Sequence, residues 1–155
     1  MPRFFKYILI GILEWFGFVH WHRWSLQGPR SRLHIAESEK SDFYRLGYAG
    51  CLFNTMSGSI RIGKNVMMGH EVRILTGRHD DTFADPLIQK PTIREGFDIT
   101  IEDGVWLTTR VIVTGGVKIG QNTTVLPGSV VTKDMPSDCI VGGIPARVIS
   151  KKQYA

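Results

Sequence analysis

IEDGVW LTTRVI VTGGVK IGQNTT VLPGSV VTKDMP, residues 101–136, is a run of six hexapeptides that each begin with an apolar residue. An α-helix cannot give this spacing, because its faces repeat every three or four residues. A chain that turns at a fixed interval can, since each turn returns one apolar side chain to a shared interior. The run therefore predicts an all-β solenoid of hexapeptide repeats. The residues that we expect to point inward are Ile101, Leu107, Val113, Ile119, Val125 and Val131.

The fifth position of the hexapeptides favours the same fold. It holds small or β-branched residues, which we expect to pack beside the corners of the coil: Val105, Val111, Val117, Thr123 and Ser129. A triangular coil needs three hexapeptides, so residues 101–136 supply two coils. A stack of coils has open ends that other segments must cap. The N-terminal residues and the segment 137–155 are the candidates for these caps.

The same period occurs upstream, where Ile62, Met68 and Ile74 are spaced by six and predict a further coil. Residues 80–98 break the phase and contain Pro86 and Pro91, which indicates a loop extruded from the body. We therefore predict a β-helix domain at 43–149 with a loop at 80–98. A connector at 25–42 precedes it, and a tail at 150–155 follows.

The N-terminal stretch FFKYILIGILEWFGFV, residues 4–19, is strongly apolar but is interrupted by Lys6 and Glu14. The uncharged run between these charges is much shorter than the ~20 residues of a membrane-spanning helix. The pattern predicts an amphipathic helix at 1–24. Two roles stay open for it: residues 3–24 pack on the solenoid or a neighbouring subunit, or they lie at the inner face of the membrane.

Composition limits the other function classes. The net charge is +5, but the basic residues are scattered and form no nucleic-acid-binding motif, so an anionic small ligand explains the excess equally well. Cys51 and Cys139 are far apart and lack a CxxC context, which argues against a zinc site or a disulfide framework. We expect one domain in the reducing cytoplasm, without nucleic acid or metal.

Among the five histidines, His79 is the candidate for chemistry. His20, His22 and His34 read as surface or interface residues, and His70 reads as an exposed corner residue. His79 ends ILTGRH, where the coil gives way to the extruded loop. A side chain there is held by rigid strands yet open to a cleft. A neutral imidazole in that position can take a proton from a hydroxyl group.

The segment from Ile60 to Ile149 resembles the hexapeptide-repeat acyltransferases. It looks most like the O-acetyltransferases of capsular, exopolysaccharide or lipopolysaccharide sugars, and less like the galactoside and maltose O-acetyltransferases. The motifs that carry the resemblance are TGRHD at 76–80, the proline-bearing loop, VW at 105–106, VVTKDMP at 130–136 and GGIPARVI at 142–149.

This resemblance implies a left-handed parallel β-helix that forms a homotrimer, with acetyl-CoA as acyl donor in a cleft between subunits and no metal. His79 would be the catalytic base, and the deprotonated sugar hydroxyl would attack the thioester directly. Backbone N–H groups near Thr109 would stabilise the oxyanion. Asn54 would contact the substrate beside the histidine.

The resemblance also implies a set of residues that bind the acyl donor. Trp106 would wall the cleft, and the cations of Lys133 and Arg147 would meet phosphates. Relatives often have Gly-Ala in place of Leu126–Pro127, and a basic residue in place of Ser150, for which Lys151 or Lys152 could substitute. The full set is Trp106, Thr109, Pro127, Gly128, Thr132, Lys133, Pro145 and Arg147.

Other functions share this scaffold. N-acetylation of an amino sugar or an antibiotic is not separated from O-acetylation by any residue of the sequence. A γ-type carbonic anhydrase needs three zinc-binding histidines, whereas the repeats hold only His70 and His79. A solenoid without activity is the third alternative, because a fold does not fix a function. We expect an O-acetyltransferase of a surface-glycan precursor, lipid-linked if the N-terminal helix contacts the membrane.

Overall fold

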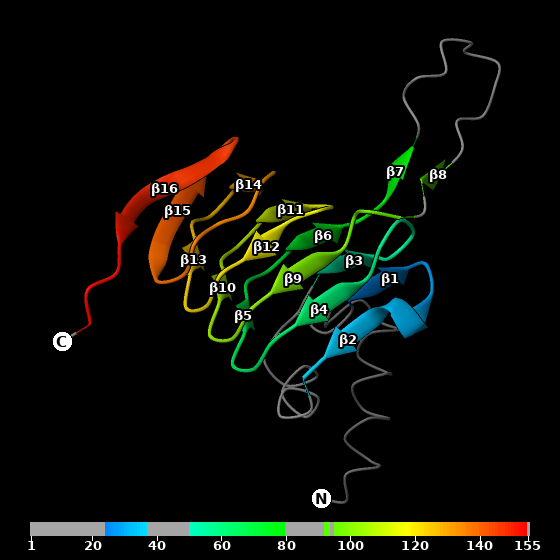
Figure 1. The fold of residues 1–155 in the computed structure, drawn as a ribbon, viewed down its shortest axis with the longest axis horizontal. Coiled ribbons are helices and arrows are strands. Elements are labelled where there is room, and N and C mark those ends of the chain that lie inside the picture. The colour runs from blue at the N-terminus through cyan, green and yellow to red at the C-terminus, as the bar shows by residue number, and fades with distance from the viewer. Residues whose placement is uncertain (1–23, 37–49, 80–91, 94, 155) are drawn as a thin grey trace, which may run out of the picture.

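The computed structural model describes residues 24–36, 50–79, 92–93 and 95–154. Three parallel sheets run along the long axis of the molecule and form a β-helix (Figure 1). Sheet A contains β1 (Ser25–Gln27), β3 (Leu52–Asn54), β6 (Arg73–Leu75), β11 (Ile112–Thr114) and β14 (Val130–Val131). Sheet B contains β2 (Leu33–Ile35), β4 (Ile60–Ile62), β9 (Ile99–Ile101) and β12 (Lys118–Ile119). The chain visits sheets A, B and C in turn.

Sheet C contains β5 (Met67–Met68), β10 (Trp106–Leu107), β13 (Thr124–Val125), β15 (Cys139–Gly143) and β16 (Ala146–Lys151). Of these strands, β16 is antiparallel to its neighbour, β15. A 3₁₀ turn, η1 (Arg30–Arg32), joins β1 to β2, and β7 (Arg78–His79) pairs with β8 (Thr92–Ile93) outside the three sheets. Within the described ranges, no helix is long and apolar enough to cross a membrane.

The core consists of columns of apolar side chains, one residue from each coil. Phe53, Ile74, Val113 and Val131 are in register on sheet A, and Met68, Leu107, Val125 and Val141 are in register on sheet C. All six residues that we predicted to point inward are at most 1% exposed, and the five predicted corner residues are at most 2% exposed. The solenoid predicted from the period is confirmed.

Two corners of the coil repeat the same backbone conformation. Left-handed φ angles occur in register at Gly50, Glu71, Arg110 and Gly128, and again at Asn65, Gly104, Asn122 and Asp138. At Gly104 a Cβ atom would lie 2.3 Å from the side-chain oxygen of Asn122, so glycine leaves room for that side chain. The amide of Asn122 in turn donates to the carboxylate of Asp138 over 3.1 Å. The corners therefore stack coil upon coil, as the core does.

The first coil corrects the predicted boundary of the domain. Residues 25–42, expected to be a connector, contain β1 and β2, which pair in parallel with β3 and β4. Leu33 is buried, and the edge of the Trp24 ring meets Phe53 with centroids 5.9 Å apart. The body therefore begins by residue 25. The helix predicted at 1–24 falls on residues 1–23, outside the described part of the chain.

The C-terminal segment closes sheet C. β16 folds back on β15 as a hairpin, and the Tyr154 hydroxyl donates to the Asp138 carboxylate over 2.8 Å. This bond holds the pKa of Asp138 below its usual range and raises that of Tyr154. Strand β16 extends to Lys151, so the predicted tail at 150–155 begins inside a strand.

Ile119 and Lys118 are adjacent in β12 and provide a matched test of the core. Ile119 is fully buried, whereas Lys118 faces outward and pairs with Glu102 over 2.7 Å. We expect Ile119→Ala to lower the free energy of unfolding by about 2–5 kcal/mol. Lys118→Ala should change it little, because exposed ion pairs contribute little. Chemical denaturation measures both, and equal losses would contradict the column of buried residues.

Candidate active site

His79 lies on a short ribbon that leaves the body after β6. It is exposed, and β7 pairs antiparallel with β8 so that His79 is opposite Thr92 and Arg78 is opposite Ile93. Figure 1 shows this ribbon projecting from the solenoid beyond the end of β6. The histidine therefore stands at the junction between coil and loop, with a second strand beside it.

The backbone before His79 is tied to the previous coil by buried polar groups. The N–H and the hydroxyl of Thr76 both donate to the carbonyl of Asn54, over 3.0 and 2.7 Å. The Ser57 N–H donates to the Thr76 hydroxyl oxygen over 3.2 Å, and the Arg78 N–H donates to the Ser57 hydroxyl oxygen over 3.0 Å. His79 thus extends from a fixed stem.

Asn54, our predicted substrate contact, lies beneath this stem. A Cβ atom on Gly77 would be 2.7 Å from the Asn54 amide, so the two residues are in close contact. The amide nitrogen of Asn54 donates to the side chain of Gln27 over 3.2 Å, and its oxygen accepts from the Met56 N–H over 3.0 Å. The structure brings Asn54 close to the histidine segment, and it gives the amide two partners within the protein.

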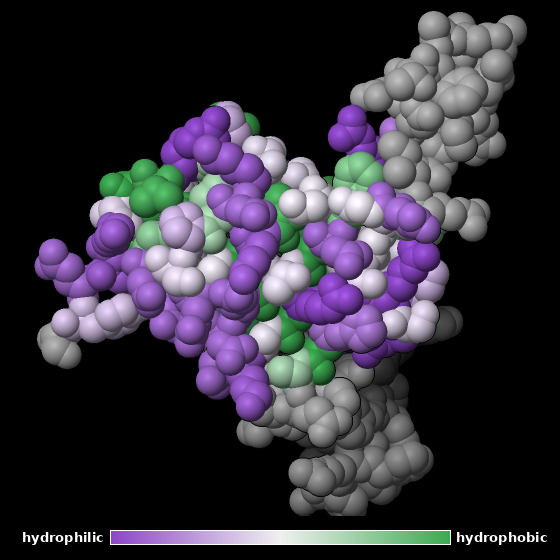
Figure 2. Space-filling model, viewed as in Figure 1, coloured by the Kyte–Doolittle hydropathy of each residue, from purple (hydrophilic) through white to green (hydrophobic). Residues whose placement is uncertain are grey.

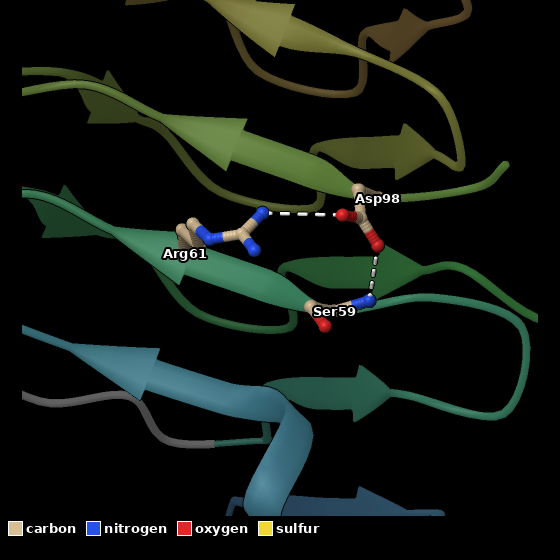
Figure 3. Close-up of polar contacts among 3 residues, drawn as sticks. All are labelled: Ser59, Arg61 and Asp98. Carbon is tan, nitrogen blue, oxygen red and sulfur yellow. Dashed lines mark hydrogen bonds and ion pairs between the residues drawn. The ribbon is translucent and has the colours of Figure 1, made fainter. Parts of the chain in front are cut away.

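The returning end of the loop is also anchored. The carboxylate of Asp98 accepts from the Ser59 N–H over 2.7 Å and from the Arg61 guanidinium over 3.1 Å (Figure 3). The hydrogen bond from Ser59, supported by Arg61, holds the pKa of Asp98 below its usual range. Phe97 packs on Gly58 and Gly115, which have no side chains to block it. Neither anchor was predicted from the sequence, because each joins segments far apart in the chain.

Most of the predicted acyl-donor residues lie at a different corner of the β-helix, where the chain passes from sheet C to sheet A. The Gly128 N–H donates to the Thr109 carbonyl over 3.0 Å, and the Gly143 N–H donates to the Ser129 hydroxyl oxygen over 3.2 Å. These bonds join two corners to the β15–β16 hairpin. Gathered here, and all exposed, are Thr109, Pro127, Gly128, Pro145 and Arg147.

This corner fits a long, anionic acyl donor. A Cβ atom placed on Gly128 would meet nothing within 4 Å, so its backbone is open to a ligand. Trp106 is 44% exposed on the outer surface of sheet C, between Met67 and Thr124. Exposed peptide groups and an aromatic wall suit a pantetheine arm, and the exposed cation of Arg147 suits phosphates.

One chain does not bring all the predicted residues together. Thr109 and Gly128 precede strands of sheet A and so lie at the amino ends of these strands. His79 follows β6 and lies at the opposite, carboxyl ends. Thr132 and Lys133 follow β14, at the same carboxyl ends as His79 but two coils further along. The predicted residues therefore form separate groups within a single chain.

Sheet B carries a polar groove that the sequence did not indicate. The groove has a volume of about 540 Å³ and includes Arg32, Asp98, Lys118 and Asp134 in its lining. Figure 2 shows that the surface over β2, β4, β9 and β12 is largely hydrophilic. None of the predicted site residues lines this groove.

The two cysteines are shielded, and the described residues form no metal cluster. Cys51 and Cys139 are both buried and free, and burial raises the pKa of the Cys51 thiol to about 11. A thiol of this kind is a poor nucleophile. Across the described ranges, no three His, Cys, Asp or Glu side chains gather as a metal site requires.

Comparison with known proteins agrees with the fold, although no family model matches the chain. The chain is 38% identical over 92 residues to a galactoside O-acetyltransferase of Lactococcus lactis, which is 59% of this chain and 43% of that protein. It superimposes on a hexapeptide-repeat acetyltransferase of Vibrio cholerae complexed with acetyl-CoA, with a TM-score of 0.57 and 27% identity over 86% of this chain and 70% of the other. Its relatives are hexapeptide-repeat acetyltransferases. The predicted resemblance to the hexapeptide-repeat acetyltransferases, and the left-handed β-helix that it implies, are confirmed.

The relatives also include an N-acetyltransferase. A 2,3,4,5-tetrahydropyridine-2,6-dicarboxylate N-acetyltransferase of Staphylococcus aureus is 33% identical over 89 residues, which is 57% of this chain and 32% of that enzyme. The matched segment thus spans less than half the length of the curated relatives. What those proteins share with this chain is their repeat region.

The Asp98 anchor gives a pH-dependent prediction. Because its pKa is lowered on folding, the carboxylate stabilises the fold above the ordinary carboxyl pKa of about 4, and this contribution disappears as pH falls through the lowered value. Asp98→Asn should therefore lower Tm near pH 7, and the gap from wild type should close towards about pH 3. Thermal denaturation across this range measures the gap, and a gap independent of pH would contradict the role of the charge.

Proposed function

We propose that the protein is an acetyl-CoA-dependent O-acetyltransferase acting on a sugar hydroxyl, with His79 as general base. The observation that carries the proposal is the exposed His79 on an anchored ribbon, in a chain whose relatives include galactoside O-acetyltransferases. An imidazole that projects from a rigid scaffold can approach a bound acceptor without burying the acceptor in the core.

The proposed reaction is direct transfer. The His79 imidazole takes the proton from the acceptor hydroxyl as its oxygen attacks the thioester carbonyl. Backbone N–H groups at the Thr109 corner stabilise the oxyanion that forms, an effect often worth about 3 kcal/mol. The C–S bond then breaks, and the imidazolium returns the proton to the departing thiolate. Before transfer, the thioester lies between Trp106 and the open corner at Gly128.

The proposed assembly is a homotrimer, and the separation of the two groups of residues supports an assembly of several copies. In one chain the Thr109 corner and His79 lie at opposite ends of the strands of sheet A. Outward residues of sheet A include the half-buried Leu52, Ile112 and Val130, and those of sheet C include Met67 and Trp106, whereas sheet B presents charged residues. Apolar outer surfaces favour contact with other copies of the chain. His79 of one copy then faces the acyl donor held by another.

The proposed acceptor is a precursor of a surface glycan, and the proposed location is the cytoplasm. If residues 3–24 form the amphipathic helix that their sequence predicts, they could hold the enzyme at the inner face of the membrane, where lipid-linked precursors are found. Flotation with liposomes tests this contact. Protein that stays entirely in the soluble fraction would exclude it.

N-acetylation is the second candidate, favoured by the N-acetyltransferase among the relatives. The same base would remove a proton from an ammonium group before attack. Mass spectrometry of products from matched hydroxyl and amino sugars separates the two reactions, because an O-acetyl ester is cleaved by mild base and an N-acetyl amide is not. A protein that releases no CoA with either class of acceptor would instead be a scaffold.

The catalytic role of His79 predicts a specific loss. We expect His79→Ala to lower kcat about 10²–10⁴-fold, since it removes the general base, while CoA binding is retained. His34→Ala is the matched control, because His34 is an exposed histidine in β2 of sheet B. CoA release with a panel of sugars is the measurement. A His79→Ala variant as active as wild type would exclude this residue as the base.

The acyl-donor corner predicts ligand-dependent stability. CoA at about one hundred times its Kd should stabilise the fold by about 2.7 kcal/mol, seen as a rise in Tm. Lys133→Ala and Arg147→Ala should each reduce this rise by weakening phosphate contacts. Lys64→Ala, an exposed lysine beside another corner, should leave it unchanged. No rise in wild-type Tm with CoA would contradict the proposed donor site.

A further inference from the structure

The tripeptide Ser57–Gly58–Ser59, in the coil before the loop, contacts both ends of the extruded loop. Ser57 binds the departing strand, Gly58 packs against Phe97, and the Ser59 N–H donates to Asp98 on the returning side. We propose that this tripeptide, through the buried hydroxyl of Ser57, is the positioning element that sets where His79 stands. The inference rests on the proposed role of His79 as the base.

The contacts of Ser57 reach the residue next to the histidine. Its side chain is fully buried. The hydroxyl oxygen accepts from the Arg78 N–H over 3.0 Å, and the hydroxyl O–H donates to the Arg78 carbonyl over 3.4 Å. Both main-chain polar groups of Arg78 therefore meet one hydroxyl. Because a peptide unit is rigid, fixing both sides of Arg78 also fixes the direction in which the chain enters His79.

The hydroxyl is itself held in place. The Ser57 N–H donates to the Thr76 hydroxyl oxygen, and Thr76 donates to the Asn54 carbonyl, so a buried chain of hydrogen bonds runs from β3 to β7. Thr76 is 1% exposed and Ser57 is 0% exposed, which leaves water little access to replace these bonds. Removing the Ser57 hydroxyl would break both of its bonds to Arg78 and with them the direct tie between this coil and β7.

The other two residues of the tripeptide fix the second end. A Cβ atom on Gly58 would lie 2.5 Å from the main chain of Phe97, so the two backbones are in direct contact. The Arg78 guanidinium lies over the Phe97 ring, 5.7 Å from its centroid, and links the two ends to each other. Asp98 adds the bonds to Ser59 and Arg61 shown in Figure 3. The tripeptide therefore holds the ribbon at both the departing and the returning end of the loop.

Displacement of a catalytic group by about 1 Å can lower a rate about 10²-fold. We expect Ser57→Ala to lower kcat about 10- to 100-fold, while the KM for acetyl-CoA and the rise in Tm with CoA stay as in wild type. Amide hydrogen exchange should become faster at residues 76–79. Ser57→Thr, which keeps the hydroxyl, should recover most of the rate.

Thr123→Val is the matched control. Thr123 is also fully buried, and its hydroxyl donates to the Pro136 carbonyl over 2.6 Å at the corner between sheets B and C. The variant should lose stability in the same way as Ser57→Ala but keep the wild-type kcat. If Ser57→Ala does not fold, Gly77→Ala tests the same stem, because its added Cβ atom would press on the Asn54 amide.

The outcomes separate this inference from the proposed function. Loss of activity in His79→Ala together with an unchanged kcat in Ser57→Ala overturns the inference and leaves the base intact. An equal fall in kcat for Ser57→Ala and Thr123→Val also overturns it, since a general loss of stability would then be the cause. Full activity in His79→Ala overturns the proposed role of His79 as the base, and this inference with it, whatever hydrogen exchange shows at residues 76–79. Absence of CoA release by the wild-type protein overturns the proposed acetyltransferase function.

Discussion

The stacking of one coil on the next is the constraint on which the rest of the structure depends. A coil of three short strands cannot bury its inward side chains alone, so each inward residue must meet its counterpart in the neighbouring coils. Ile62, Ile101 and Ile119 satisfy this requirement on sheet B, in register across three coils. Any segment outside the coils, such as the extruded loop, must leave and rejoin the coil without disturbing this register.

The sequence revealed the coils wherever their length was regular. Between Val113 and Ile119 the chain turns from sheet A to sheet B in six residues, and the period is plain. The first coil was missed because Leu26 and Ile35, which pair with Phe53 and Ile62, are nine positions apart, with η1 between them. The corner from sheet A to sheet B absorbs the extra residues. The six-residue period therefore did not reveal the first coil. The extruded loop leaves the body at the same corner, between sheets A and B.

The site was predictable to different extents. His79 was found because it coincides with the break in the period, and the residues of the acyl-donor corner came from the resemblance. The role of Ser57 gave no signal, because a serine in a turn is ordinary and its contact with Arg78 spans 21 positions of sequence. The separation of His79 from the Thr109 corner also depends on three-dimensional arrangement, since both sit at corners of the same repeat.

The two ends of the extruded loop are held together, and this separates the stacking of the core from the sequence of the loop. Ile74 and Ile101 remain in register with their neighbours although the loop lies between them, since Asp98 and Ser57 fix its two ends to the coil. The sequence between β7 and β8 can then change in length or composition without altering the stacked core. Such an arrangement lets evolution exchange this segment as a cassette, while the scaffold and His79 keep their geometry.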